Sequence, residues 1–270
     1  MSHGHHHSPS PPPPAPPPVV TPPSGATLHY SANGNFANGD FNAAGDPGSV
    51  GFNMADVSSQ SVADSLPSGV VGLMWTGGPT GDTASFESMI NATASDPKVW
   101  GYYLADDAQP GDAVNLKAEV DYIHQHAPTK MSFVLPENMS GDTSPVAAFG
   151  PAAVDMTTSN DLVGVDPYPV RSQYAGGMNL DVINDRVAAW ESAGWQDSQM
   201  VPLFQAFGNY PGGDWNLPST TQENEILQRW ASLLPSPKFD YAYSWGQQLG
   251  DTSLSMSPDL QQVFAAHNAA

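Results

Sequence analysis

The sequence has 270 residues, of which 40% are hydrophobic and 10% aromatic, and it contains no cysteine. These proportions allow a buried core, and the lack of cysteine excludes disulfide bonds and thiolate metal sites. The formal net charge is −20, with 27 Asp and Glu against 7 Lys and Arg. Such a charge repels phosphate groups, so we expect neither nucleic acid nor an anionic membrane surface as a partner.

Residues 1–25 differ in composition from the rest of the chain. Four histidines (His3, His5, His6 and His7) precede a segment, residues 9–23, that contains ten prolines. Proline can neither donate to a sheet nor continue a helix, so the segment predicts an extended spacer. The histidines indicate either a tag or polar tail, or a loose transition-metal binder. We therefore predict a disordered tail over residues 1–25 and a single domain over residues 26–270.

From residue 50 onward, short apolar runs alternate with amphipathic stretches. The apolar runs read as strands buried on both faces, as in a parallel sheet, and they cover residues 50–57, 70–76, 99–104, 131–135, 162–166, 201–206 and 239–245. Helical spacing and helix start signals predict helices over residues 83–94, 112–126, 181–193, 219–234 and 258–267.

This alternation predicts repeated βαβ units and a single (β/α)8 barrel of the α/β class. The count is one strand short, so we expect the eighth strand near residues 27–31 or 249–254. A doubly wound open sheet is the alternative. Against it, no G-x-G-x-x-G or G-x-x-x-x-G-K-[ST] motif follows the first predicted strand.

Function in a parallel barrel gathers at the carboxyl ends of the strands, so the residues that end each predicted strand are the candidate site. The candidate catalytic carboxylates are Asp106, Asp107, Glu137 and Asp166. The candidate substrate-binding residues are Asn53, Trp75, Tyr103, Asn138, Tyr168, Gln205, Trp245 and Gln247.

These residue types suit the hydrolysis of acetals. That reaction needs one protonated carboxyl group for the leaving oxygen and one ionised carboxylate as nucleophile or base. Crowded acids raise one another's pKa, which keeps one of them protonated. Aromatic rings offer flat faces to sugars, and amides bind hydroxyls without adding charge.

Four segments carry a resemblance to a known group of proteins. Residues 100–110 (WGYYLADDAQP) resemble the G-[YW]-Y-L-x-D-E-P segment of glycoside-hydrolase-like barrels, and residues 162–169 (LVGVDPYP), 204–209 (FQAFGN) and 241–247 (YAYSWGQ) resemble strand ends in those barrels. The resemblance covers about residues 50–268. It implies a glycoside hydrolase in which the acid on the third predicted strand is Asp107, although Glu is usual at that position.

We therefore predict a glycoside hydrolase acting on a polysaccharide or oligosaccharide, with Asp107 as general acid, Glu137 as its partner, and Asp106 and Asp166 tuning the charge. Two departures favour an alternative, a non-catalytic carbohydrate-binding barrel. Asp107 replaces the usual Glu, and the seventh predicted strand ends in Trp245 and Gln247 where a Glu is expected. A second alternative is a passenger domain of a secreted surface or calcium-dependent protein.

The candidates also have structural explanations. Asp166 can fix a turn before Pro167, Glu137 can be a solvated charge, and Trp245 can belong to the core. We expect no metal or cofactor at the site, while Asp40 and Asp46 offer a calcium loop as an alternative that lacks the usual D-x-D-x-D-G spacing. The partner we expect is carbohydrate, and the protein is predicted to be an extracellular monomer, in mature form or exported without an ordinary signal peptide.

Overall fold

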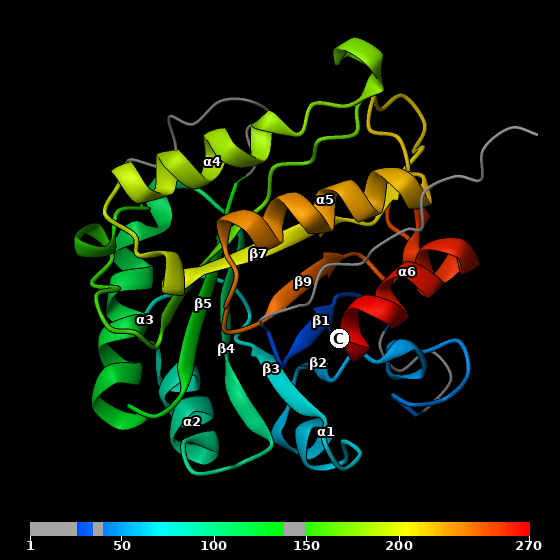
Figure 1. Cartoon of the computed structure of the whole chain (residues 1–270). Coiled ribbons are helices and arrows are strands. Elements are labelled where there is room, and N and C mark those ends of the chain that lie inside the picture. The colour runs from blue at the N-terminus through cyan, green and yellow to red at the C-terminus, as the bar shows by residue number, and fades with distance from the viewer. Residues whose placement is uncertain (1–25, 35–39, 138–148) are drawn as a thin grey trace, which may run out of the picture.

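Eight parallel strands close into a barrel in the order β1-β2-β3-β4-β5-β6-β7-β9 (Figure 1). The computed structural model describes residues 26–34, 40–137 and 149–270. The barrel strands are β1 (His29–Ser31), β2 (Met54–Val57), β3 (Val71–Trp75), β4 (Val99–Ala108), β5 (Met131–Pro136), β6 (Asp161–Val165), β7 (Met200–Gln205) and β9 (Asp240–Tyr243). The prediction of a (β/α)8 barrel is confirmed, and the open sheet is wrong because the strands form a closed ring.

The eighth strand is β1, at the first of the two predicted places. It pairs in parallel with β9 through Tyr30 opposite Tyr241, and with β2 through Tyr30 opposite Met54, so it closes the ring. The other predicted place, residues 249–254, contains only β10 (Thr252–Ser253). This short strand pairs antiparallel with β8 (Phe207–Gly208) in a separate two-stranded sheet.

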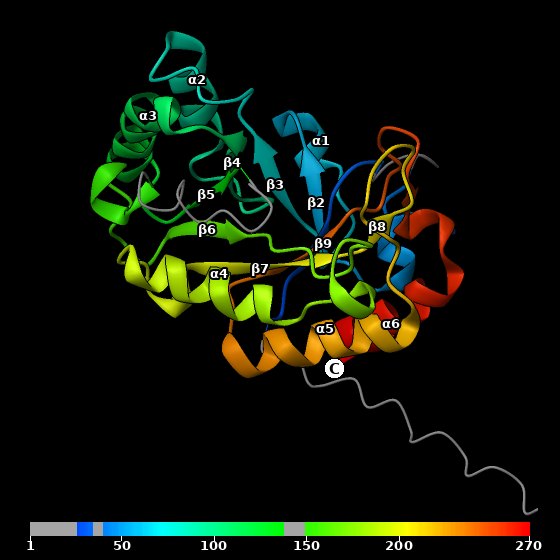
Figure 2. The same cartoon turned by 90° about the horizontal axis from the view of Figure 1, so that it is seen from above.

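Six α-helices surround the strands in the described part of the chain. They are α1 (Gln60–Asp64), α2 (Ala84–Thr93), α3 (Ala113–His126), α4 (Asp181–Ser192), α5 (Thr220–Leu233) and α6 (Pro258–Ala269). Helices α1 to α3 lie outside β2 to β5, and α4 to α6 lie on the other side of the barrel (Figures 1 and 2). None of the helices in the described ranges is long and apolar enough to cross a membrane.

Helix α5 shows how the sequence sets these boundaries. Ser219 is the N-cap, and its side chain accepts a hydrogen bond from the backbone N–H of Gln222, whose own side chain bonds back to Ser219. This reciprocal capping satisfies amide groups that the first turn leaves without partners. The buried residues Ile226, Leu227 and Trp230 then follow at helical spacing and pack toward the barrel.

Alternation along the strands separates two buried layers. One apolar cluster fills the barrel interior and includes Met54, Leu73, Phe133, Leu203 and Tyr241. The neighbours of these residues in sequence belong to the second cluster, between strands and helices. Because successive strand side chains point to opposite faces, the residues that continue the interior series beyond the strand ends face the mouth of the barrel. That mouth is where the candidate site lies.

Candidate functional site

Two adjoining cavities at the carboxyl ends of the strands form one groove. Their volumes are about 310 Å³ and 260 Å³, and they share Asp106, Tyr243 and Gln248. The first half is also lined by Tyr30, Ala32, Asn33, Asp56, Leu73, Trp75, Tyr103 and Tyr241. The second half is also lined by Asp107, Leu135, Asp166, Tyr168, Phe207, Tyr210, Trp215, Leu249 and Asp251. Five carboxylates line the groove, and none of these lining residues is Lys, Arg or His.

The end of β4 brings two consecutive carboxyl groups into this groove. In a regular strand, neighbouring side chains point to opposite faces. Here Asp107 has a left-handed backbone conformation, with φ of 50°. The pairing of β4 with β5 also shifts register between Tyr103 and Ala105 and again before Ala108. This irregularity interrupts the alternation, and Asp106 and Asp107 both line the second half of the groove.

The surroundings of both carboxyl groups favour the protonated form. Burial against the groove wall is the larger cause of the raised pKa of Asp106, followed by the charge of Asp107. For Asp107, burial again raises the pKa most, followed by the charge of Glu137. The two differ in their hydrogen bonds, because Asp106 accepts from the Tyr103 hydroxyl, 3.4 Å away, and from the backbone of Asp107. Those donors oppose part of the increase in the pKa of Asp106.

Asp166 lies deeper, immediately after β6. Its side chain is 5% exposed, and burial raises its pKa well above the usual value. The buried Arg186 of α4 opposes this effect, while the charges of Asp107 and Asp106 add to it. Asp166 is therefore a buried carboxyl group on the floor of the groove whose surroundings favour the protonated form.

Glu137 occupies a different position from the one expected for a catalytic partner. It follows β5, is half-buried, and its backbone N–H donates to the carbonyl oxygen of Ala108 at 3.0 Å. It is close enough to raise the pKa of Asp107, but it lines neither half of the groove. The neighbouring candidate, Asn138, lies outside the described residues.

Aromatic side chains form the walls of both halves. In the first half, Trp75 is 38% exposed and its ring centroid lies 5.3 Å from that of Tyr103. In the second half, Tyr168 is half-buried and packs edge-on against Phe207 at 4.9 Å. The predicted candidates Trp75, Tyr103 and Tyr168 therefore lie together with the carboxylates, at the positions where they were expected.

Four other predicted binding residues are placed elsewhere. Asn53 precedes β2, because residues 47–50 form a 3-10 helix and the strand starts only at Met54. Its side chain accepts from the backbone N–H of His29 at 2.7 Å and donates to the Thr27 carbonyl at 2.8 Å. Asn53 therefore lies at the amino end of the barrel, away from the groove.

Gln205 and Trp245 are core residues. The Gln205 amide is fully buried and bonds to the backbone of Val170 through both its oxygen and its nitrogen, at 2.9 and 3.0 Å. Trp245 is 2% exposed, packs against Phe52, and donates from Nε1 to the Gly45 carbonyl. Because β9 ends at Tyr243, its strand alternation does not continue to Trp245. Neither side chain reaches the groove in this structure.

The fourth residue, Gln247, is exposed and bonds to the carbonyl oxygen of Asp251 at 2.8 Å. Its neighbour Gln248 lines the groove instead and accepts a hydrogen bond from the Tyr243 hydroxyl. The predicted strand was right here, but the loop that follows it turned a different amide toward the site.

Several groove residues were not among the predicted site residues. Tyr30 comes from the short strand β1, and its hydroxyl donates to Asp56, which also accepts from the backbone N–H of Asn33 at 2.8 Å. The position of Asp56 near the end of β2 was a usable signal. Tyr241 and Tyr243 alternate on β9 and were available from the same strand pattern.

The predicted calcium loop has little support in the described residues. Asp40 is exposed and accepts from the backbone N–H of Asn42 at 3.0 Å, whereas Asp46 is buried beside the 3-10 helix over residues 47–50. Residues 35–39, which precede Asp40, lie outside the described part of the chain. The loop stays a prediction.

No family model matches the sequence, and no curated protein matches it. Solved structures do match. A β-mannanase from Thermomonospora fusca aligns with a TM-score of 0.56 at 15% identity, covering 90% of this chain and 89% of that one. The catalytic domain of a mannanase from Streptomyces sp. SirexAA-E aligns with a TM-score of 0.53 at 15% identity, covering 95% and 91%.

A β-glucanase from Saccharophagus degradans gives a TM-score of 0.51 at 11% identity, covering 89% of this chain and 87% of that one. The chain spans only 26% of a longer neighbour, Bacteroides uniformis beta-glucuronidase 2, with a TM-score of 0.45. At these identities the likeness shows the fold: this chain is a glycoside-hydrolase-like (β/α)8 barrel, as the resemblance implied.

Proposed function

We propose that this protein is a glycoside hydrolase that cleaves a polysaccharide or oligosaccharide bound in the groove. One observation carries the proposal. Asp106, Asp107 and Asp166 converge on a groove with aromatic walls and no basic lining residue. Acetal hydrolysis requires this combination of a protonated carboxyl group and a second carboxylate. The barrels it resembles include a mannanase whose structure is a mannohexaose complex.

In the proposed mechanism, Asp107 donates the proton to the leaving glycosidic oxygen. Its pKa is raised by burial and by the charge of Glu137. No side chain among the described residues is seen to donate a hydrogen bond that would stabilise its carboxylate. Asp106 acts in its ionised form, as nucleophile or as base toward water, because the Tyr103 hydroxyl and the Asp107 backbone favour that form. Glu137 is then a positioning residue that keeps Asp107 protonated, and no longer the reacting partner predicted from sequence.

Asp166 lies beneath the reacting pair and takes no direct part in the proposed mechanism. Because burial raises its pKa well above the usual value, we expect replacement by an amide to disturb the site less than the same change at Asp107. This distinguishes Asp166 from Asp107, since Asp107→Asn removes the proton that the reaction uses.

The test is a screen for release of reducing ends from soluble mannans, β-glucans and their oligosaccharides, with Asp107→Asn, Asp106→Asn and Asp166→Asn measured on any substrate found. We expect Asp107→Asn and Asp106→Asn each to lower kcat/KM by about 10²- to 10⁴-fold, and Asp166→Asn to retain activity within about tenfold. Equal turnover by wild type, Asp107→Asn and Asp106→Asn would contradict the mechanism.

A non-catalytic carbohydrate-binding barrel is the second candidate. It is favoured by the Asp at position 107 and by the end of β9, where Trp245 is buried and Gln247 bonds to the backbone. This candidate predicts glycan binding without turnover, with binding unchanged in Asp107→Asn and weakened in Trp75→Ala. Calorimetric titration with the same oligosaccharides separates the two candidates. An enzyme would leave hydrolysis products in the calorimeter sample, whereas a binding protein would leave the oligosaccharide intact.

A further inference from the structure

A buried cluster of two histidines and one aspartate lies away from the groove. His29 begins β1, Asp240 begins β9, and His267 lies in the last turn of α6. Both strand residues are the first of their strands, so the cluster is at the amino end of the barrel. His29 and Asp240 are also register partners across the β1–β9 pairing that closes the ring. We call this group the seam cluster.

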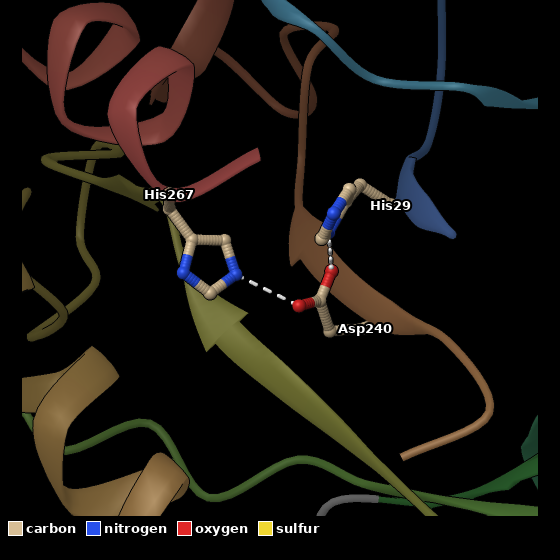
Figure 3. A group of neighbouring side chains, drawn as sticks. All are labelled: His29, Asp240 and His267. Atoms are coloured by element: carbon tan, nitrogen blue, oxygen red, sulfur yellow. Dashed lines mark hydrogen bonds and ion pairs between the residues drawn. The ribbon is translucent and has the colours of Figure 1, made fainter. Parts of the chain in front are cut away.

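All three side chains point toward one another (Figure 3). Nδ1 of His29 lies 2.7 Å from Oδ1 of Asp240, and Nε2 of His267 lies 2.7 Å from Oδ2 of the same carboxylate. The side chains are 3%, 4% and 6% exposed, in the order His29, Asp240 and His267. Within the described residues, this is the one group of three or more potential ligands whose atoms all lie within 4.8 Å of one another.

Two imidazoles and a carboxylate are a ligand set that zinc accepts. Zinc binds each such ligand at about 2.0–2.2 Å, so ligand atoms in a tetrahedral site lie about 3.4 Å apart. The present separations are 2.7 Å for the two bonded pairs. The two bonded pairs would open by about 0.7 Å in a coordination site, and the two histidine nitrogens, which lie within 4.8 Å of each other, would take up a similar spacing.

A second observation concerns the space beside the cluster. Asp240 and His267 line a cavity of about 20 Å³, together with Trp230 and apolar side chains. That volume holds one water molecule, the usual occupant of an open zinc position. Nε1 of Trp230 and Nδ1 of His267 are buried and have no hydrogen-bond partner among the described residues. The cavity can therefore hold a polar occupant, such as the water that would complete a zinc site.

The missing partner at Nδ1 also bears on the state of His267. The hydrogen bond made by one ring nitrogen normally decides which nitrogen carries the proton. In the hydrogen-bonded cluster the Asp240 carboxylate accepts from Nε2 of His267, which therefore carries a proton. No described residue bonds to Nδ1, so the ring proton can move to Nδ1 when zinc displaces it from Nε2. Nε2 is therefore able to bind a metal ion as neutral imidazole.

We propose that His29, Asp240 and His267 form a zinc-binding site that fastens the first and last strands of the barrel and helix α6 together. The ion would crosslink residues that are 211 and 27 positions apart in the chain. Its role is structural, because the cluster lies at the opposite end of the barrel from the groove, and it does not depend on what the groove does.

The test must remove the histidines of residues 1–25, which bind metals without any fold. All proteins therefore carry His3, His5, His6 and His7 replaced by alanine in the full chain. After treatment with EDTA, each protein is incubated with zinc, passed through a desalting column, and its zinc content and melting temperature are measured. We expect one equivalent of zinc and a higher melting temperature.

His29→Gln and His267→Gln should each weaken zinc binding by at least about tenfold, since even loss of a second-shell partner costs 10- to 100-fold. The matched control is His124→Gln. His124 also bonds to a buried strand-start aspartate, Asp161, at 2.8 Å, but no second histidine among the described residues joins this pair. That variant should bind zinc as the parent does.

Cobalt provides a measurement that needs no cluster variant. In the protein with the four tail histidines replaced, cobalt should give the intense visible absorption of four-coordinate Co²⁺. A spectrum identical to that of hydrated cobalt, or equal zinc retention by the parent and His267→Gln, would overturn the proposal and leave the seam cluster a hydrogen-bonding network.

Discussion

The two ends of the barrel shift the pKa of their aspartates in opposite directions. At the amino end, the Asp240 carboxylate accepts hydrogen bonds from ring nitrogens of His29 and His267, each at 2.7 Å. These bonds lower the pKa of Asp240 to about 2, against the effect of burial. At the carboxyl end, burial and neighbouring negative charges raise the pKa of Asp107 and Asp166.

This difference shows that burial alone does not decide the charge of a carboxyl group. Donors aimed at the carboxylate stabilise the anion, and neighbouring anions destabilise it. Asp161, at the start of β6, is also hydrogen-bonded at the amino end, where it accepts from Ser132 Oγ at 2.7 Å and from the Thr158 backbone N–H at 2.9 Å. At the amino end, hydrogen bonds to Asp240 stabilise the fold. At the carboxyl end, the raised pKa values of Asp107 and Asp166 favour proton transfer by their carboxyl groups.

The largest effect should come from the groove. Asp107→Asn should lower kcat/KM by about 10²- to 10⁴-fold, because the general acid is lost, while the melting temperature at pH 7 stays equal or rises. Glu137→Gln is the control. Removing its charge lowers the pKa of Asp107, so the decline in rate on the alkaline side should move to lower pH while activity in acid persists. An unchanged pH profile in Glu137→Gln would contradict the role assigned to it.

At the amino end, the corresponding substitution should affect stability. Asp240→Asn removes the buried carboxylate to which His29 and His267 are hydrogen-bonded. It should reduce the free energy of unfolding by about 3–5 kcal/mol. Because the folded pKa is below the ordinary 3.8, the contribution of Asp240 is present above that value and lost as pH falls toward 2. Urea unfolding of wild type at pH 6 and pH 3 should show this loss, and Asp240→Asn should show a smaller one. Equal free energies of unfolding for wild type and Asp240→Asn at pH 6 would contradict the stabilising role assigned to Asp240.

Glu119 on α3 tests the same rule away from either end. Its carboxylate oxygens are buried without a partner among the described residues, and burial followed by the charges of Asp112 and Asp82 raises its pKa to about 8. The protonated form is thus favoured on folding, and stability falls as pH rises from about 4.5 through 8.

Glu119→Gln should therefore stabilise the protein by about 1–3 kcal/mol at pH 9 and by less at pH 5. Melting curves at the two pH values provide the measurement, since 1 kcal/mol corresponds to about 2–4 °C in a protein of this size class. The exposed Glu225→Gln on α5 is the control, with no expected pH-dependent gain. A gain independent of pH would show that charge is not the cause.

The smallest effect should come from the wall of the groove. Trp75→Ala removes the exposed ring that packs against Tyr103. We expect a loss of about 0.5–1.5 kcal/mol in binding, or about 2- to 12-fold in KM, with kcat nearly unchanged. Steady-state kinetics on a long and a short oligosaccharide would check this, because only substrates that reach the first half of the groove should be affected.

The sequence predicted the barrel well because its buried strands read as apolar runs of the right spacing. Strand β1 was difficult because it has only three residues, too few for a periodic signal. Asp106, Asp107, Asp166 and Trp75 were expected at the mouth of the barrel, where the structure places them, because strand ends in a parallel barrel share one face.

The errors arose where the backbone departs from a regular strand. Asn53 was assigned to the wrong end because a 3-10 helix occupies residues 47–50. Gln205 and Trp245 were expected to bind substrate at strand ends, but long-range packing buries both side chains, and no local sequence pattern records that packing. The seam cluster had no signal at all, because His29 and His267 come from opposite ends of the sequence.

The closing of the ring by β1 has a consequence for how the protein folds. Ser31 Oγ donates to the carbonyl oxygen of Ala242, 211 positions away, so the last contacts of the barrel cannot form until β9 is in place. Contacts so distant in sequence slow folding, because the entropy of a long loop must be lost before they are gained. Until then β2 and β9 are open sheet edges, which pair readily with other chains. We therefore expect the refolding yield to fall as protein concentration rises, even under conditions in which the native protein is stable.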